Sequence, residues 1–320
     1  MPSIPLSRRN MLGGALAGGL GLAGALVLGS RDRRSEPQSA FRIAHLTDLH
    51  VHAGAIGEVR LAVQHALSHD AAPRMIVTGG DLIYDAMARS ERSVSRQWRQ
   101  FHRAFDGAGA IRVEHIIGNH DIWGVNSKKC GTTGREPLIG KAWAKRELGL
   151  DRLYRSFDAG GWHWVLLDDV QALPEHATYE GRLDEEQFAW LEADLRDSDP
   201  AVPVVVVSHV PILSSSAFFL PQCNDTDRWN LPFMLMHADA RRIVGLFERH
   251  GNVMLCLSGH THLVDHVEYK GVNYLGNGAV CGNWWTGAFQ GFEPGYGLVD
   301  LYPDGSFESR YCSYRSDPVA

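Results

Sequence analysis

The sequence repeats one kind of junction, in which a short apolar run leads into polar residues that can bind a metal ion. Five such runs occupy residues 41–47, 74–79, 113–118, 202–208 and 253–258. The polar residues at their ends are, in chain order, Asp48, His50, Asp81, Asn119, His120, Asp121, His209, His260 and His262. One such residue after one strand is usually structural, but the joint pattern predicts a metal site assembled from five strand ends.

Helical patterns separate the apolar runs. These patterns cover residues 58–69, 92–105, 185–196 and 237–250, and a further apolar run lies at 162–168. Short apolar runs between helical patterns indicate parallel β–α–β units, and ligands of such sheets gather outside the carboxyl ends of the strands. After Leu263 the helical patterns stop, and antiparallel strands are predicted at 264–269, 272–275, 296–302 and 306–311.

The five motifs read "DLH", "GD", "GNHD", "SH" and "GHTH" along the chain. They resemble the D-x-H, G-D, G-N-H-D/E, H and G-H-x-H motifs of the calcineurin-like metallophosphoesterases, in the same order. The resemblance implies an α/β fold over residues 41–320, a β-sandwich of two mixed sheets flanked by helices. The late strands would then supply part of the second sheet.

The same resemblance implies ligands for two metal ions. One ion would be held by Asp48, His50, Asp81 and His262, and the other by Asp81, Asn119, His209 and His260. The shared aspartate would bridge two ions about 3.5–4 Å apart. Nitrogen and oxygen donors without a thiolate favour iron, manganese or zinc.

Two such ions imply hydrolysis of phosphoric esters by in-line attack of a metal-bridging hydroxide, with phosphodiesters of small molecules favoured. His120 follows the ligand Asn119 and is the predicted general acid, with Asp121 orienting its imidazole; the alternative for Asp121 is a helix cap. A net charge of −6 disfavours long nucleic acid as a partner. The alternative functions are an acid-type phosphomonoesterase and a metal-binding member without activity.

Several residues near the motifs are predicted to lie outside the ligand set. Tyr84, in "GDLIY", stands where the purple acid phosphatases carry an iron-binding tyrosine, but His50 makes that ligand superfluous, so Tyr84 is predicted to be structural or to line the pocket. The other three are His52, Asp265 and His266. The loop that follows residue 275 contains Trp284 and Trp285, which either line the pocket or pack against the edge of the sandwich.

Residues 1–30 are predicted to be an export signal of the twin-arginine type. Arg8 and Arg9 precede a glycine- and alanine-rich apolar run from Met11 to Gly29, so the twin-arginine export machinery is an expected partner. The protein would then be periplasmic or extracellular, and an uncleaved leader would tether it to a membrane. Residues 31–40 read as a polar linker.

Overall fold

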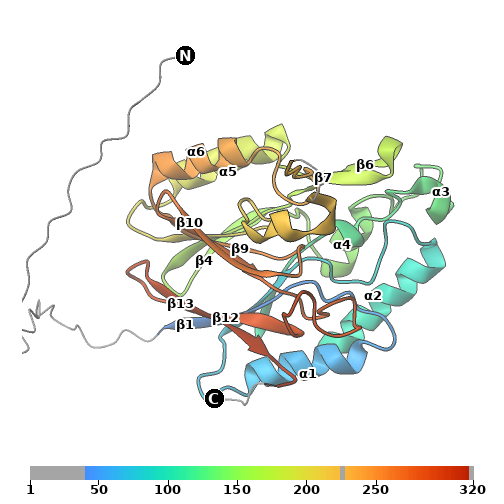
Figure 1. The fold of residues 1–320 in the computed structure, drawn as a ribbon, viewed down its shortest axis with the longest axis horizontal. Helices are drawn as coiled ribbons and strands as arrows, with labels where there is room; N and C mark the ends of the chain where they lie inside the picture. The colour runs from blue at the N-terminus through green and yellow to red at the C-terminus, as the bar shows by residue number, and fades with distance from the viewer. Residues whose placement is uncertain (1–39, 224–227, 317–320) are drawn as a thin grey trace, which may run out of the picture. The chain divides into compact units, whose positions relative to one another are not determined.

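The computed structural model describes residues 40–223 and 228–316. The predicted export signal over residues 1–30, and the predicted linker up to residue 39, lie outside this part of the chain. None of the described helices is long and apolar enough to cross a membrane. The folded body is built on two β-sheets that pack face to face (Figure 1).

The first sheet has five strands in the order β13-β12-β1-β2-β3. Its parallel strands are β1 (Phe41–Leu46), β2 (Met75–Gly79) and β3 (Arg112–Ile116). Its antiparallel strands are β12 (Gly295–Leu301), which pairs with β1, and β13 (Phe307–Ser313), which pairs with β12.

The second sheet has six strands in the order β10-β11-β9-β8-β5-β4. Its parallel strands are β5 (Trp162–Leu166), β8 (Val204–Val207), β9 (Val253–Ser258) and β11 (Val272–Asn277). Its antiparallel edge strands are β4 (Arg155–Ala159) and β10 (Val264–Tyr269). A separate hairpin consists of β6 (Val170–Leu173) and β7 (Thr178–Gly181).

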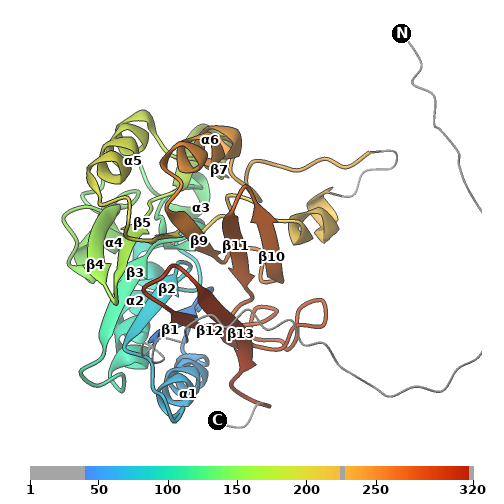
Figure 2. The same cartoon turned by 90° about the vertical axis from the view of Figure 1, so that its left-hand side faces the viewer.

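Helices cover the outer faces of both sheets (Figures 1 and 2). The first sheet is covered by α1 (Ile56–Leu67) and α2 (Glu91–Phe105), and the second by α5 (Glu185–Asp197) and α6 (Ala240–His250). The shorter helices are α3 (Ser127–Cys130), α4 (Ala142–Leu148) and the 3₁₀ turns Asn119–Asp121, Pro174–His176, Ser216–Phe219 and Pro221–Cys223.

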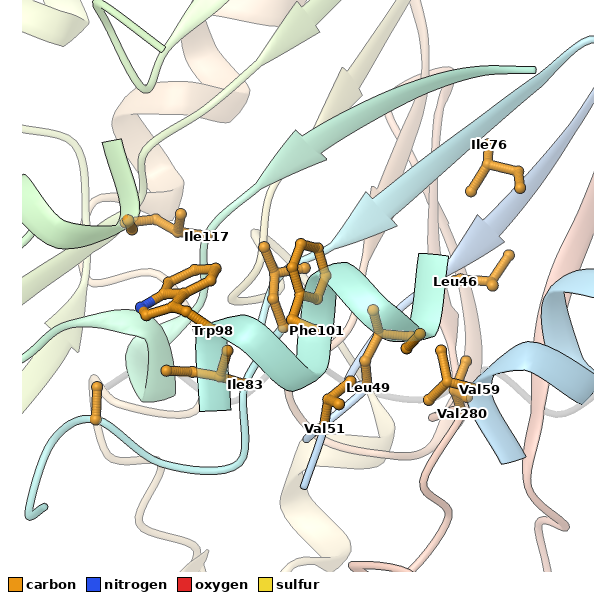
Figure 3. Packing of buried hydrophobic residues seen from close by; sticks show 14 of the residues in the cluster. Leu46, Leu49, Val51, Val59, Ile76, Ile83, Trp98, Phe101, Ile117 and Val280 are labelled. Carbon is orange, nitrogen blue, oxygen red and sulfur yellow. The ribbon is translucent and has the colours of Figure 1, made fainter. Parts of the chain in front are cut away.

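The central strands are apolar throughout because they are buried on both faces. In β8, Val205 and Val207 pack between the two sheets, whereas Val204 and Val206 pack on the side of α5 and α6. The first sheet has the same arrangement, and Figure 3 shows Trp98 and Phe101 of α2 in the cluster that covers its outer face. This double burial fixes where each central strand ends and where its polar residues begin.

The predicted sandwich of two mixed sheets flanked by helices is confirmed, and the predicted elements agree with the structure to within a few residues. The late strands are divided between the sheets: β10 and β11 extend the second, and β12 and β13 the first. The predicted antiparallel pairing is present between β10 and β11 and between β12 and β13, but β11 also pairs in parallel with β9. The second sheet is thus extended by strands that follow the last helix, α6, in the sequence.

Candidate metal centre

The structure brings all seven predicted metal ligands together where five strands end. Asp81, after β2, lies in the middle: its Oδ2 is 3.4 Å from His50 Nε2 and 3.4 Å from His209 Nε2. On one side, Asp48 Oδ1 lies 3.2 Å from His262 Nε2. On the other side, His209 Nε2 lies 3.1 Å from Asn119 Oδ1 and 3.1 Å from His260 Nδ1.

These atoms form two overlapping groups that share Asp81. One group is Asp48, His50 and Asp81, and the other is Asp81, His209 and His260, with the atoms of each group within 4.8 Å of one another. The shared residue is the one whose carboxylate the sequence motifs assign as the bridge. A third group of His50, His262 and Cys281 adds a buried thiol next to the first group.

Backbone carbonyls orient all four histidines. Each ring places one nitrogen within hydrogen-bond distance of a carbonyl oxygen, and because a carbonyl only accepts, that nitrogen carries the proton. The pairs are His50 Nδ1 with Tyr84 at 3.2 Å, His209 Nδ1 with Gly79 at 2.8 Å, His260 Nε2 with Met234 at 2.7 Å and His262 Nδ1 with Gly282 at 2.7 Å. The second nitrogen of each ring faces the centre.

The two carboxylates in the site are held ionised. Burial raises the pKa of Asp48, but the nearby His262 and His209 outweigh it and lower that pKa to about 2. Burial likewise raises the pKa of Asp81, but His209 and His120 hold it well below its usual range. Two buried negative charges therefore attract positive charge into the centre.

The pKa values of the histidines in the site shift in opposite directions, depending on the charged groups around each ring. Burial lowers the pKa of His209, but Asp81 and Asp48 outweigh it and raise that pKa to about 10. Burial dominates for His50 and His260: it lowers the pKa of His50 to about 3 and that of His260 to about 4. Burial also lowers the pKa of His262, but Cys281 and Asp48 outweigh it and hold that pKa well above its usual range. Neutral imidazoles beside paired carboxylates are the donors that a transition-metal ion requires.

Two further observations fit metal ions at this place. Asp48 Oδ1 and His50 Nε2 are buried without a hydrogen-bond partner, which is rare for polar atoms in a protein interior unless an ion or water binds them. A Cβ added to Gly118 would lie 2.2 Å from Asp81 Oδ1, and one added to Gly259 would lie 2.4 Å from Asp48 Oδ2. The backbone thus approaches the ligands as closely as only glycine permits.

His120 borders the centre but contacts a different acid from the one predicted. Its ring nitrogen Nδ1 lies 3.3 Å from Asp85 Oδ1, while its backbone N–H donates to Asp81 Oδ1 at 2.8 Å. Burial lowers the pKa of His120, but Asp81 and Asp85 outweigh it and raise the pKa above its ordinary value. A raised pKa keeps a proton available for donation near neutral pH.

The prediction that Asp121 orients the imidazole of His120 is wrong. The buried Asp121 carboxylate accepts backbone N–H groups from Leu82 at 2.9 Å, Ile83 at 3.0 Å and Gly118 at 2.8 Å. Asp121 closes the short 3₁₀ turn after β3, so its side chain points back at the backbone that follows β2. It fixes the two ligand-bearing loops against each other.

A cavity of about 210 Å³ opens beside the centre. Its walls include Asp81, Asn119, His120, His260 and His262, together with Tyr179, Leu220, Gln222, Met234, Leu235, Thr261, Asn283, Trp284 and Phe289. Among the described residues that line it, none is lysine or arginine. The cavity wall therefore combines the candidate metal ligands with apolar and uncharged polar side chains.

The two tryptophans have different roles. Trp284 lines the cavity, and its ring centroid lies 3.9 Å from that of His50. Trp285 packs against the core on the side of the first sheet, and its Nε1 donates to the His50 carbonyl at 2.9 Å. Tyr84 packs edge-on against Trp284 and supplies a carbonyl to His50, a structural contact of the kind predicted for it.

The three residues predicted to lie outside the ligand set have partners of their own. His52 accepts the Gly54 N–H at 3.1 Å, and His266 Nε2 lies 2.9 Å from Asn273 Oδ1 on the neighbouring strand. Asp265 accepts hydrogen bonds from Ser214, Ser215 and Ser216. Sequence reasoning missed Asp85, Tyr179 and the carbonyl of Met234, because no motif marks residues that reach the centre only through tertiary packing.

Comparisons with known proteins agree with this geometry. The model of the family described as calcineurin-like phosphoesterase matches residues 41–264. A 3′,5′-cyclic-nucleotide phosphodiesterase from Nostoc sp. is 24% identical over 167 residues, which cover 51% of this chain and 56% of that relative. The match thus spans little more than half the length of the relative.

Two solved structures share the fold. A dimetal phosphatase from Danio rerio superposes with a TM-score of 0.62 at 16% identity, over 87% of this chain and 97% of the other. The anchor protein GAP50 of the inner membrane complex of Plasmodium superposes with a TM-score of 0.55 at 13% identity, over 88% and 87%. The family match covers most of the chain and contains every predicted ligand. The chain therefore belongs to the calcineurin-like phosphoesterases, a family of metal-dependent phosphoesterases.

Proposed function

We propose that this protein hydrolyses phosphodiesters of small molecules at a dinuclear metal centre. The observation that carries the proposal is the absence of lysine and arginine among the described residues that line the cavity. A phosphodiester carries one negative charge, whereas a phosphomonoester carries nearly two at neutral pH. A cavity whose positive charge comes only from the metal centre and His120 suits the monoanion better.

The residues present fit two ions. Asp48, His50, Asp81 and His262 would hold one, and Asp81, Asn119, His209 and His260 the other, with iron, manganese or zinc favoured by these donors. Bound ions would supply a nucleophilic hydroxide near neutral pH and offset charge on the phosphoryl oxygens. The Nostoc relative supports diester chemistry, since it is a 3′,5′-cyclic-nucleotide phosphodiesterase.

His120 supplies the proton for the leaving group. Asp85 engages Nδ1, so Nε2 is the nitrogen left to donate a proton to the departing oxygen. The backbone bond to Asp81 fixes His120 relative to the bridging carboxylate. The Trp284 ring lies edge-on to the His120 ring at 5.0 Å, centroid to centroid, and both residues line the cavity.

Two nitrophenyl esters test the charge argument directly. Bis(4-nitrophenyl) phosphate and 4-nitrophenyl phosphate release the same alcohol and differ in charge and in one nitrophenyl group, so their kcat/KM ratio reports diester preference and its change in a charge variant reports the effect of charge. We expect the diester to be favoured by at least about tenfold, or about 1.4 kcal/mol. Elemental analysis of the same sample, purified without chelator, should give about two transition-metal ions per chain.

A charge variant sharpens the test. Gln222→Lys places a cation in the cavity wall and should shift the ratio towards the monoester, whereas Gln64→Lys adds the same charge on an exposed position of α1 and should not. A wild-type preference for the monoester would overturn the proposal in favour of an acid-type phosphomonoesterase. Full metal content without turnover of either ester would indicate a metal-binding protein without activity.

A further inference from the structure

Exposed aromatic side chains gather on one segment between β8 and α6. Four of the seven large apolar side chains exposed in the described part of the chain lie there: Phe218, Phe219, Trp229 and Phe233. Phe219 is 69% exposed and Trp229 is 62% exposed. Single exposed apolar residues are ordinary, but such a concentration marks a binding surface.

Three of these residues form a cluster in contact. The ring centroid of Trp229 lies 6.0 Å from that of Phe218 and 6.3 Å from that of Phe219. We call these three residues the aromatic cluster. Exposed polar residues flank it at Ser215, Gln222 and Asn230, which gives the surface both apolar rings and polar groups.

The backbone beneath the aromatic cluster is packed. Leu220, Cys223, Leu235 and Leu263 form a small core of their own under this segment. The Asp265 carboxylate on β10 accepts hydrogen bonds of 2.7 Å, 2.7 Å, 2.8 Å and 3.0 Å from the serines 214–216 that precede the cluster. The fold therefore holds the rings in solvent.

The same segment forms one wall of the metal cavity. Leu220, Gln222, Met234 and Leu235 line that cavity, and Leu220 directly follows the cluster residue Phe219. Phe218 also borders a second hollow, an apolar groove of about 710 Å³. The large apolar side chains of the groove are Leu213, Phe218, Met236, Val244, Val267 and Tyr269, and Arg241 and Lys270 are also among its lining residues.

We infer that the aromatic cluster docks on a phospholipid bilayer and that the substrate is a lipid phosphodiester presented there. The inference rests on the proposed diesterase function. Phenylalanine and tryptophan beside polar groups are typical of the interfacial zone of membranes, and a groove of this size accepts a hydrocarbon chain. Because the cluster stands on the segment that lines the metal cavity, a bilayer bound there would present its phosphodiester head groups beside that cavity.

The reaction on such a lipid is an ordinary hydrolysis. The oxygen of water bonds to phosphorus and one phosphorus–oxygen ester bond breaks. Of the two water protons, one is balanced by the proton that the departing oxygen takes, and the other leaves the phosphomonoester for solvent. The products are an alcohol and a phosphomonoester, with no oxidant or further reactant. Product charge rises at the phosphate, which weakens its fit to a cavity without lysine or arginine and favours its release.

Vesicle sedimentation with the full chain tests the docking surface. The probe is vesicles of phosphatidylcholine and phosphatidylglycerol, compared with vesicles of phosphatidylcholine alone. We expect Phe219→Ser combined with Trp229→Ser to weaken binding to both by at least about tenfold. Leu61→Ser removes an apolar side chain that is 43% exposed on α1 and should leave binding unchanged. Any contribution of the N-terminal leader is the same in all three proteins.

Activity separates this inference from the proposed function. The double variant should lose hydrolysis of phosphatidylglycerol in vesicles and keep wild-type turnover of soluble bis(4-nitrophenyl) phosphate, because neither side chain lines the cavity. Equal vesicle binding by the double variant and the wild type would overturn the docking surface. Conversion of a dimer to a monomer by the double variant, in sedimentation velocity, would assign the cluster to self-association instead. Failure of the wild type on both the soluble diester and the lipid, with vesicle binding intact, would overturn the diesterase function and the lipid substrate and leave the docking surface standing.

Discussion

His237 forms buried ion pairs with Asp169 and Asp239 behind the metal centre, and this group of three residues is called the relay below. Replacing His237 should change the stability of the protein in a pH-dependent way. Asp169 accepts the backbone N–H of His209 at 3.0 Å and of Val210 at 2.8 Å, and its Oδ2 lies 3.0 Å from His237 Nε2. His237 Nδ1 lies 3.0 Å from Asp239 Oδ1. The relay thus ties the end of β8, which carries His209, to the start of α6.

The magnitude follows from the charge state of His237. Burial lowers its pKa, but hydrogen bonds to Asp169 and Asp239 outweigh burial and raise the pKa from 6.5 to about 9. At about 1.4 kcal/mol per pH unit, the protonated form contributes about 3 kcal/mol to folding. Loss of one partner from a buried ion pair costs about 3–5 kcal/mol, which agrees.

The direction of the pKa shift determines the pH range in which His237 stabilises the fold. Because the folded pKa lies above the unfolded value, the contribution is fully present below pH 6.5 and is lost as pH rises through about 9. His237→Gln keeps a hydrogen-bonding side chain without the charge. It should therefore lower the free energy of unfolding by about 3 kcal/mol at low pH and by much less above pH 9.

Urea denaturation of both proteins at pH 6 and above pH 9, at equal metal content, measures this difference. His266→Gln is the matched control, since His266 is exposed on β10 and its Nε2 lies 2.9 Å from Asn273 Oδ1. This change should cost less than about 0.5 kcal/mol at both pH values. A His237→Gln deficit that is the same at both pH values would refute the assignment of a charged relay.

Three further predictions concern the centre and the leader. His120→Ala should lower turnover of alkyl phosphodiesters by about 10²–10⁴-fold and that of nitrophenyl esters much less, since only poor leaving groups need the proton; equal losses on both would contradict the general-acid role. Gly118→Ala places a Cβ 2.2 Å from the bridging carboxylate, so metal content and activity should fall together, and full metal content by elemental analysis would contradict this reading. Replacing Arg8 and Arg9 by lysine should trap the chain in the cytoplasm of a bacterial host, as cell fractionation would show; unimpaired export would point to the route for unfolded chains.

The central strands could be predicted from the sequence because burial on both faces leaves an unbroken apolar run. The run that contains β8 is apolar over all four strand residues and ends directly before the polar residues that follow it. Strand β4, with the sequence "RSFDA", is half-exposed at a sheet edge. Polar and apolar residues are therefore mixed in it, and no continuous apolar run marks it in the sequence. The hairpin of β6 and β7 was missed for the same reason.

That the candidate ligands lie together could be predicted because each follows a buried strand end within a few residues. The partners that orient them could not, since they come from segments distant in sequence: Met234 reaches His260 from 26 residues away, and Asp169 reaches His209 from 40. The wrong partner for His120 has a related cause. Asp121 is adjacent in sequence, but the side chain of the last residue of a short turn satisfies the nearest backbone donors.

The backbone at the metal centre is strained, and the sheets hold it in place. Five of the seven predicted ligands adopt the left-handed conformation: Asp48 at φ 54°, His50 at 37°, Asp81 at 50°, His260 at 70° and His262 at 58°. Each non-glycine residue held there costs about 1–3 kcal/mol. Hydrogen bonds that continue the pairing of β1 and β2 beyond their ends hold this backbone, since Asp48 N–H donates to the Gly80 carbonyl at 3.1 Å and His50 N–H to the Asp81 carbonyl at 2.8 Å. The buried strands therefore stabilise the strained backbone that carries the predicted ligands. This explains why each predicted metal ligand closely follows an apolar run in the sequence.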